Sequence, residues 1–446
     1  MHLLQLFRYN RLNFPVFVDY TAKMWYTLMA AVKKLSMKLK LQESFKMNIA
    51  VAQSGGPTCA INASLLGVFR QALKEEQIEH IFGSINGIEG IINDRLVELN
   101  AVITTAEDME LLRQTPSTVL GSCRYKLPDV KDDETVYKQI IDCFLRHGIG
   151  AFFYIGGNDS MDTVAKLGDY VKNHSLDIRI IGIPKTIDND LACTDHTPGF
   201  GSAAKYVATT IQEIIRDSSV YSIDSVTVVE VMGRHAGWLT ASSCVLRANG
   251  ETAPHLIYLP ECDFSAEKFI EDVKKARQVH KAVIVAVSEG LKIDGDYSNS
   301  TRKVDSFGHE ALSGIGKQLE MIISEEMHCK VRSIELNVMQ RCSSHLSSKT
   351  DIEEAEIVAE EAVRYAMNGG TGVMMGFRRV SNTPYTVKVE PFPAEAVANK
   401  ERFFPKKWIN DAENNVTNEA LEYFLPLIHG EQIIRMNNGV PIHFHL

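Results

Sequence analysis

Five times along the chain, a short apolar run rich in β-branched residues ends in a polar turn. Because these runs are continuously apolar rather than alternating, they favour strands covered by helices on both faces. A helical stretch follows, and repeated strand–turn–helix units predict an α/β fold with mostly parallel sheets. A chain of 446 residues is long enough for two such domains. The predicted strands are Asn48–Ala52, Ala151–Ile155, Ile178–Ile183, Ser225–Val231 and Ala282–Val287.

The turns after these strands hold most of the unusual glycine, aspartate and arginine residues of the chain. Ligands of open α/β sheets bind at the carboxyl ends of the strands, which is where these turns lie. The sequence therefore predicts one phosphate-handling site assembled from several loops. The turns are Ser54–Pro57, Gly156–Ser160, Pro184–Asp190, Met232–Gly237 and Ser288–Gly290.

Two common phosphate-transfer signatures are missing from the sequence. There is no G-x-x-x-x-G-K-[ST], which disfavours a P-loop NTPase, and no H-R-D or D-F-G set of a protein kinase. A phosphoryl-transfer site in this chain would therefore rely on glycine turns that bring backbone N–H groups to the phosphates.

Two of the glycine turns have simple structural interpretations when taken alone. Ser54–Pro57 reads as an ordinary turn. Gly156–Ser160 adds an amide that can bind metal and a carboxylate, but it also fits a helix start capped by Asp159 or Ser160. Neither turn by itself predicts a function.

The turn Pro184–Asp190 is the more informative one. It places Asp188 and Asp190 at alternate positions, with Lys185 and Thr186 just before them. In a phosphoryl transfer, one carboxylate can accept the proton of the attacking hydroxyl while the other holds a metal or orients its neighbour. The alternative is an acidic turn that only ends a strand.

Charge and cysteine content narrow the class of protein. A net charge of −9 disfavours a nucleic-acid binder, because surfaces that track phosphates need an excess of Lys and Arg. The eight cysteines form no C-x-x-C pair, so we expect reduced thiols in a cytoplasmic protein. No membrane partner is expected either, since apolar stretches such as Met24–Val32 are too short to span a bilayer.

The first 46 residues differ from the rest, with eight Lys and Arg against two acids, Asp19 and Glu43. No secretory signal is evident, because the long apolar core and the small-residue cleavage site are missing. We interpret 1–46 as a basic, dispensable N-terminal extension; a targeting segment is the alternative.

Taken in order, the motifs resemble those of the phosphofructokinase family. Besides the turns above, Gly121–Arg124, the VVEVMGR run Val229–Arg234 and the segment Leu336–Arg341 match in order and spacing. The resemblance covers about Met47 to Gly376. It implies two Rossmann-like domains with the active site in the cleft between them.

The resemblance also implies a role for each site residue. Asp188 would be the general base for the 1-hydroxyl of fructose 6-phosphate, flanked by Thr186 at the sugar and by Asp190. The other predicted roles are donor binding by Gly56 and Arg124, sugar binding by Met232, Gly233, Arg234 and Glu289, and 6-phosphate binding by Arg332 and Arg341.

Two positions indicate the phosphoryl donor. Family members that use ATP typically carry GGDGS and PGTIDND, whereas this chain has Asp159 and Lys185 at the variable glycine positions. A carboxylate at Asp159 would oppose a nucleotide α-phosphate by volume and charge. Lys185 would stabilise the departing phosphate. We therefore expect a reversible pyrophosphate-dependent enzyme that acts on fructose 6-phosphate and diphosphate; the alternatives are ATP dependence and a non-catalytic family member.

Two departures from the family pattern bear on ligands. Asn158 stands where many relatives have an aspartate that serves Mg²⁺, so we expect Mg²⁺ to be held with less negative charge. Val338 stands where relatives place His or Tyr against the sugar phosphate. A related acceptor such as sedoheptulose 7-phosphate therefore stays open.

The resemblance implies discontinuous domains and an oligomer. We expect a donor domain of 47–199 plus about 340–390, and a sugar-phosphate domain of 200–339 plus about 391–446. Because arginines of a neighbouring subunit often complete this site in the family, a homodimer or homotetramer is implied. Ser225 replaces one such arginine.

Overall fold

The computed structural model describes residues 28–29, 46–293 and 314–446. By its contacts the chain divides into Met1–Met47 and Asn48–Leu446. Nearly all of the basic 1–46 segment and the charged stretch Asp294–Asp305 lie outside the described residues. No helix among the described residues is long and apolar enough to cross a membrane.

The larger of two main sheets has seven strands in the order β11-β10-β5-β4-β1-β2-β3. Its centre is parallel, with β4 between β1 and β5, and β10 returns to pair with β5. The pairs β10–β11 and β2–β3 are antiparallel. The strands are β1 (Met47–Gln53), β2 (Ile78–Ser84), β3 (Leu96–Glu98), β4 (Ile149–Gly156), β5 (Arg179–Pro184), β10 (Val373–Asn382) and β11 (Tyr385–Pro393).

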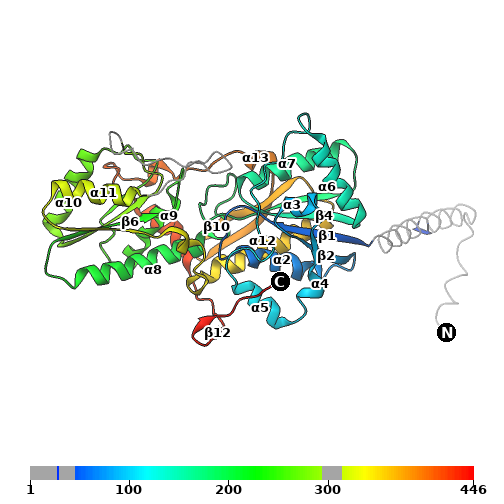
Figure 1. Ribbon diagram of the computed structural model, residues 1–446, viewed down its shortest axis with the longest axis horizontal. Coiled ribbons are helices and arrows are strands. Elements are labelled where there is room, and N and C mark those ends of the chain that lie inside the picture. Colours follow the sequence, from blue (N-terminus) through cyan, green and yellow to red (C-terminus); the bar gives the residue numbers. More distant parts are fainter. Residues whose placement is uncertain (1–27, 30–45, 294–313) are drawn as a thin grey trace, which may run out of the picture. The chain divides into compact units, whose positions relative to one another are not determined.

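Helices cover both faces of this sheet (Figure 1). Two helices pack on one face, α2 (Ile61–Ala72) and α12 (Lys349–Met367). Two others pack on the opposite face, α6 (Glu134–Arg146) and α7 (Asn158–Asn173). Gly67 allows α2 and α12 to approach closely, because a Cβ there would lie 2.4 Å from the Glu356 carbonyl oxygen. Burial on both faces explains why the strands are continuously apolar. Short helices α3 (Ile88–Ile92), α4 (Leu99–Val102) and α5 (Ala106–Gln114) follow β2 and β3.

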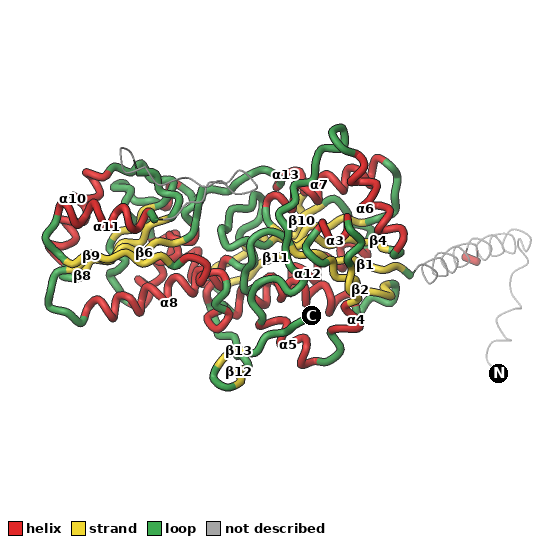
Figure 2. Tube along the Cα trace, viewed as in Figure 1, coloured by secondary structure: helices red, strands yellow, loops and turns green. Residues whose placement is uncertain are grey.

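The smaller sheet is parallel throughout, in the order β7-β8-β6-β9. Alternate residues of β6 face opposite cores: Val229 and Val231 pack with α8, whereas Val226 and Val228 pack with α10 and α11. Figure 2 shows these strands between helices. The elements are β6 (Ser225–Val231), β7 (Leu256–Tyr258), β8 (Ala282–Ser288), β9 (Lys330–Glu335), α8 (Phe200–Ser219), α10 (Ala266–Val279) and α11 (Ile315–Glu326).

The remaining elements are short. Two lie after β6 and two after β9, and the rest form the tail that follows β11. They are α9 (Trp238–Ala241), η1 (Ser242–Asn249), η3 (Asn337–Arg341), η4 (Ser344–Leu346), α13 (Ala394–Val397), η5 (Lys406–Trp408), α14 (Asn418–Phe424), η6 (Leu425–Ile428), β12 (Met436–Asn437) and β13 (Val440–Pro441).

All five predicted strands are confirmed, and so is the α/β fold with mostly parallel sheets. The tail differs from the expectation that it covers one domain. Strand β11 extends to Pro393, and Ala394 and Val397 are buried in the core of the seven-stranded sheet. Phe424 is instead buried with the four-stranded sheet, while Phe444 returns to the seven-stranded one. Apolar residues spaced along the tail reach both cores, so the predicted boundary at about 391 does not coincide with a change of sheet.

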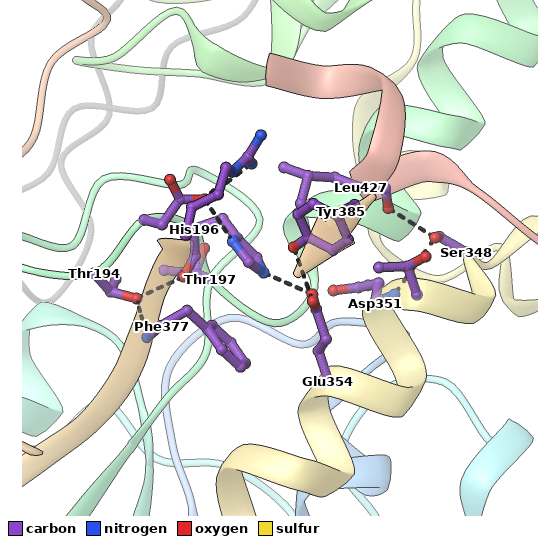
Figure 3. Close-up of polar contacts among 12 residues, drawn as sticks. Thr194, His196, Thr197, Ser348, Asp351, Glu354, Phe377, Tyr385 and Leu427 are labelled. Carbon is purple, nitrogen blue, oxygen red and sulfur yellow. Dashed lines mark hydrogen bonds and ion pairs between the residues drawn. The ribbon is translucent and has the colours of Figure 1, made fainter. Parts of the chain in front are cut away.

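A buried ionic network joins α12 to the loop that precedes α8 (Figure 3). The His196 ring lies between two carboxylates, with Nδ1 2.9 Å from Asp195 Oδ2 and Nε2 2.7 Å from Glu354 Oε2. The His196 ring also stacks on the Phe377 ring, and the two ring centres are 4.6 Å apart. Burial alone would lower the pKa of His196, but the Glu354 and Asp195 carboxylates raise it to about 9. His196 is therefore a cation at neutral pH.

The amino end of α8 is held from the same helix, α12. The buried carboxylate of Asp351 accepts hydrogen bonds from the backbone N–H groups of Gly199, at 2.8 Å, and Ser202, at 3.0 Å. It satisfies donors that a helix start leaves without partners and lies at the positive end of the helix dipole. The 20-residue helix α8 is thereby tied to the helix layer of the other sheet.

The raised pKa of His196 predicts a loss of stability at alkaline pH. Its stabilising contribution is fully present below the unfolded-state pKa of about 6.5 and is lost as the pH rises through about 9. We expect the free energy of unfolding to fall by about 3 kcal/mol over that window, at about 1.4 kcal/mol per pKa unit. Urea unfolding between pH 6 and pH 9.5 measures it. A His196→Gln variant with the same pH dependence as the wild type would contradict the assignment.

Candidate active site

The turns at the carboxyl ends of β1, β4, β5, β6 and β8 meet at one pocket of about 650 Å³. Turns of both sheets line it, so the structure brings together the loops that the sequence predicts to form one site. Twelve predicted site residues are among its walls: Gly56, Arg124, Asn158, Asp159, Lys185, Thr186, Asp188, Asp190, Met232, Arg234, Glu289 and Arg341.

Lys185 connects two of these turns. Its side chain leaves the end of β5 and is only 2% exposed, and its Nζ donates to the Gly56 carbonyl oxygen at 2.6 Å. Burial lowers the pKa of this amine to about 8, against the attraction of Asp188 and Asp190. With a pKa of about 8, Lys185 is mostly protonated at neutral pH, but it gives up its proton more readily than an exposed lysine does.

Thr186 orients Asp188. The threonine hydroxyl donates to Asp188 Oδ2 at 3.2 Å and accepts from the Asp188 N–H at 3.1 Å. Burial raises the pKa of Asp188, while the Thr186 hydroxyl and the nearby cations, Lys185 and Arg234 among them, oppose that rise. A fixed carboxylate with a raised pKa is a stronger base than a solvated one, which suits proton abstraction from a hydroxyl.

Two further carboxylates at the pocket titrate near neutral pH. Burial, followed by the negative charge of Asp188, raises the pKa of Asp190 to about 7. Burial also raises the pKa of Glu289 to about 7, although the Gly233 N–H 3.4 Å from its Oε1 and the Arg234 charge work the other way. Since Asp188 and Asp190 interact, their protons belong to the pair rather than to either residue.

The amino end of α7 opens into the pocket. Its first turn has no side-chain cap, because the N-cap is Gly157 and not Asp159 or Ser160, the caps that the sequence also allows. Uncapped N–H groups and the helix dipole together form an anion site. Asp159 is exposed in this first turn and lines the same pocket.

The side chain of Asn158 has an oxygen that could serve as a metal ligand. Its Nδ2 donates to the Lys400 carbonyl oxygen at 2.9 Å, which sets the orientation of the amide. Its Oδ1 is buried and has no hydrogen-bond partner. An unpartnered amide oxygen beside carboxylates is a suitable oxygen ligand for Mg²⁺, so the residues present fit a divalent cation. Among the described residues, Asp94, Cys143 and His147 also cluster, but Arg146 already pairs with that aspartate.

Gly233 and Arg332 are not among the residues that line the pocket. Gly233 contributes backbone only: its carbonyl oxygen accepts from the Ser288 hydroxyl at 2.6 Å, and its φ of 141° requires glycine. Arg332 lies on the edge strand β9, where its Nη1 is 3.3 Å from Asp217 Oδ2. The pocket of its own chain is therefore not where Arg332 would meet a substrate.

Eleven residues that line the pocket are not among the predicted site residues. Seven of them lie within the predicted motifs: Ser54, Gly55, Cys123, Gly157, Ser160, His235 and Ala236. Four lie outside every motif: Tyr125, Asn399, Glu401 and Phe403. His235 could have been found, because it follows directly after Arg234 in the predicted turn. Asn399, Glu401 and Phe403 come from the tail, which has no strand–turn signal, and Tyr125 directly follows the motif Gly121–Arg124. His235 Nδ1 lies 2.8 Å from Glu401 Oε1, so a predicted turn and the unpredicted tail meet at the pocket.

Comparison with known proteins identifies the family. Residues 48–366 match the family model described as Phosphofructokinase. The chain belongs to the phosphofructokinase family. Its similarity is to the pyrophosphate-dependent branch. Two relatives named pyrophosphate–fructose 6-phosphate 1-phosphotransferase, from Halomonas elongata and Xanthomonas campestris, are each 37% identical over 88% of this chain and 94% of theirs.

A solved structure gives the same result for this phosphofructokinase. The pyrophosphate-dependent phosphofructokinase from Marinobacter aquaeolei superposes with a TM-score of 0.79 at 33% identity, over 89% of this chain and 95% of that one. The family resemblance inferred from short motifs is thus confirmed over most of the chain.

The turn after β8 must carry glycine at position 290. A Cβ there would lie 1.8 Å from the Arg234 carbonyl oxygen and 2.8 Å from that of Gly233, so backbone would have to move. We expect Gly290→Ala to lower the free energy of unfolding by about 1–3 kcal/mol, the usual cost of overpacking. Gly157→Ala is the matched control, since its Cβ would meet only the Lys185 carbonyl oxygen, at 3.6 Å. Equal stability of the two variants in urea unfolding would contradict this packing.

Proposed function

We propose that this chain is a reversible pyrophosphate-dependent phosphofructokinase. It transfers a phosphoryl group from diphosphate to the 1-hydroxyl of fructose 6-phosphate, giving fructose 1,6-bisphosphate and phosphate. The observation that carries the proposal is the pair Asp159 and Lys185, which both line the pocket. The names of the related proteins support the same donor.

In the proposed reaction, Asp188 takes the proton of the 1-hydroxyl as its oxygen attacks one phosphorus of diphosphate. The bridging P–O bond breaks, and the leaving phosphate takes the electron pair. Arg234, Met232 and Glu289 would hold the sugar. Burial keeps the carboxylate of Asp188 basic, and Thr186 keeps it aimed, so the base is set before the substrate arrives.

Donor selection follows from charge and space. Lys185 and Arg124 would neutralise the diphosphate, close to the Gly56 turn and the amino end of α7. A nucleotide would have to bring its α-phosphate past the Asp159 carboxylate, which repels it. Diphosphate has no such extension.

We also propose Mg²⁺ as the cofactor, with Asn158 Oδ1 as a ligand. When bound, the ion would neutralise negative charge on the diphosphate oxygens. Arg341 and, from a second copy of the chain, Arg332 would bind the 6-phosphate, which makes a homodimer or homotetramer part of the proposal. A cytoplasmic location agrees with eight free cysteines and no disulfide among the described residues.

The donor is tested by initial rates with fructose 6-phosphate and Mg²⁺, with diphosphate or ATP as the sole donor. We expect turnover with diphosphate only. In the Asp159→Gly, Lys185→Gly double variant, we expect diphosphate turnover to fall and ATP turnover to become measurable. Turnover with ATP alone in the wild type would mean that these two residues do not select the donor. Inactivity with both donors would favour another acceptor or a non-catalytic family member.

The proposed base is tested by Asp188→Asn, which keeps size and the Thr186 contact but removes basicity. We expect kcat to fall by about 10²–10⁴, the usual worth of general-base catalysis. Diphosphate binding, measured by calorimetry, should not weaken, because the variant removes a negative charge. Near-normal kcat would exclude Asp188 as the base.

The proposed metal ligand is tested by titrating activity with Mg²⁺ in Asn158→Ala. We expect the Mg²⁺ concentration for half-maximal rate to rise by about 10–100-fold, as for loss of a metal-supporting group. Asn93→Ala is a control on an asparagine outside the pocket. An unchanged Mg²⁺ requirement in Asn158→Ala would remove this residue from the metal site.

A further inference from the structure

One segment of the tail, 399–404, runs along the pocket and contacts three of its turns. Asn399 Nδ2 donates to Asp162 Oδ1 at 2.8 Å, and the Lys400 carbonyl accepts from Asn158, both on α7. Glu401 pairs with His235 after β6. The third turn, Pro184–Asp190, is contacted through Arg402, and this contact is the most extensive.

The Arg402 guanidinium donates to backbone carbonyls of the catalytic turn and the loop after it. Nε and Nη2 donate to the Asn189 oxygen at 3.2 and 2.8 Å, and Nη1 donates to the Thr194 oxygen at 2.8 Å and also to that of Asp195. The Arg402 backbone N–H donates to the Asp190 oxygen at 2.7 Å. One residue thus holds the carbonyls on both sides of the loop that begins next to Asp188.

Arg402 also contacts Trp238, which lies four residues after Arg234 in the chain. The guanidinium carbon lies 4.3 Å from the centre of the buried Trp238 ring, and Trp238 Nε1 donates to the Arg402 carbonyl oxygen at 2.9 Å. Stacking on an aromatic face is a favourable contact for a guanidinium. Arg402 therefore joins the turn that carries the carboxylates to the segment that carries Arg234.

We propose that Arg402 is a positioning residue for phosphoryl transfer: it fixes the turn of Asp188 and Asp190 against the Trp238 segment, and so sets the base relative to the sugar site. This inference rests on the proposed function for its effect on turnover, but the geometry that it describes exists without substrate.

Only arginine can make this set of contacts. Its planar guanidinium has five donors, so it can bind several carbonyls while its face stacks on a ring; lysine offers one rotating ammonium. Asn189 has a φ of 55°, and its side chain is fully buried between Tyr423 and the Thr197 N–H. A turn held in this conformation depends on partners for its carbonyls. Without Arg402, the Asn189 and Thr194 carbonyls lose these donors.

The first experiment measures turnover in Arg402→Lys. We expect kcat to fall about 10–100-fold, because a displacement of about 1 Å in a reacting group costs that much. The KM for diphosphate should stay within about threefold, since binding common to ground and transition states is not removed. The matched control is Arg247→Lys, whose guanidinium also binds a backbone carbonyl, that of Val416 at 2.8 Å, outside the pocket. It should lose stability but keep kcat.

Two further readouts separate positioning from folding. In Arg402→Ala, added guanidinium ion should restore part of kcat, whereas Arg247→Ala should show no such gain. Hydrogen exchange, without any substrate, should lose protection at the Asp188, Asp195 and Thr197 amides in Arg402→Ala but not in Arg247→Ala. Their acceptors are the Thr186 hydroxyl, the Phe377 carbonyl oxygen of β10 and the Asn189 side chain, respectively.

The outcomes distinguish this inference from the proposed function. If the wild type does not turn over diphosphate, the proposed function fails, and hydrogen exchange still decides the role of Arg402. Unchanged protection of the three amides in Arg402→Ala would overturn the inference. Lost protection together with unchanged kcat in an active enzyme would also overturn it, because the contact would then be structural only.

Discussion

The bond from the Lys185 ammonium to the Gly56 carbonyl is the constraint around which the pocket is arranged. An ammonium that is almost fully buried is costly unless it has acceptors and negative charge nearby. Asp188 and Asp190 supply that charge from the same turn, and the Gly56 carbonyl supplies the acceptor from the turn after β1. The cation is therefore retained because the turns meet, and the turns stay together in part because the cation needs them.

Burial also disfavours the charged form of the carboxylates at the pocket, as it does for Lys185, but for acids this raises the pKa. Burial raises the pKa of Asp188, Asp190 and Glu289, so each holds its proton more tightly than in water. The cations beside them prevent the rise from neutralising the site altogether. The local free energy spent on burying these groups is offset by the large apolar cores on either face of each sheet. The loop that follows Asp190 also carries Asp195 and His196, and the contact of His196 with Glu354 joins this loop to α12.

The sequence predicts the strands and their turns well, because each is a local pattern: an apolar run of the right length, then glycine and polar residues. Since parallel strands end at a common edge, the convergence of those turns also follows. The tail is a different case. Glu401 reaches the pocket, and Arg402 the turn beside it, between Val397 in one core and Phe404 and Phe424 in another. No periodic signal in the sequence encodes that path.

Arg332 shows a second limit of the sequence. Its motif position predicts a phosphate contact, yet its strand lies at the edge of the smaller sheet and its guanidinium pairs with Asp217. A motif specifies which residue type is present, but it does not specify which copy of the chain the residue serves. The role of Arg332 therefore stays a prediction about an assembly.

The return of β10 to the side of β5 has a consequence for biosynthesis. Ribosomes deliver the chain from its amino end, so β1, β4 and β5 emerge long before residues 373–393 that complete their sheet. Throughout that interval β5 has an open hydrogen-bonding edge, and such edges pair readily with other chains. The whole smaller sheet is translated while the larger one is still unfinished. The larger sheet therefore reaches its full strand order only after residues 373–393 have been synthesised, and the edge of β5 needs shielding until then.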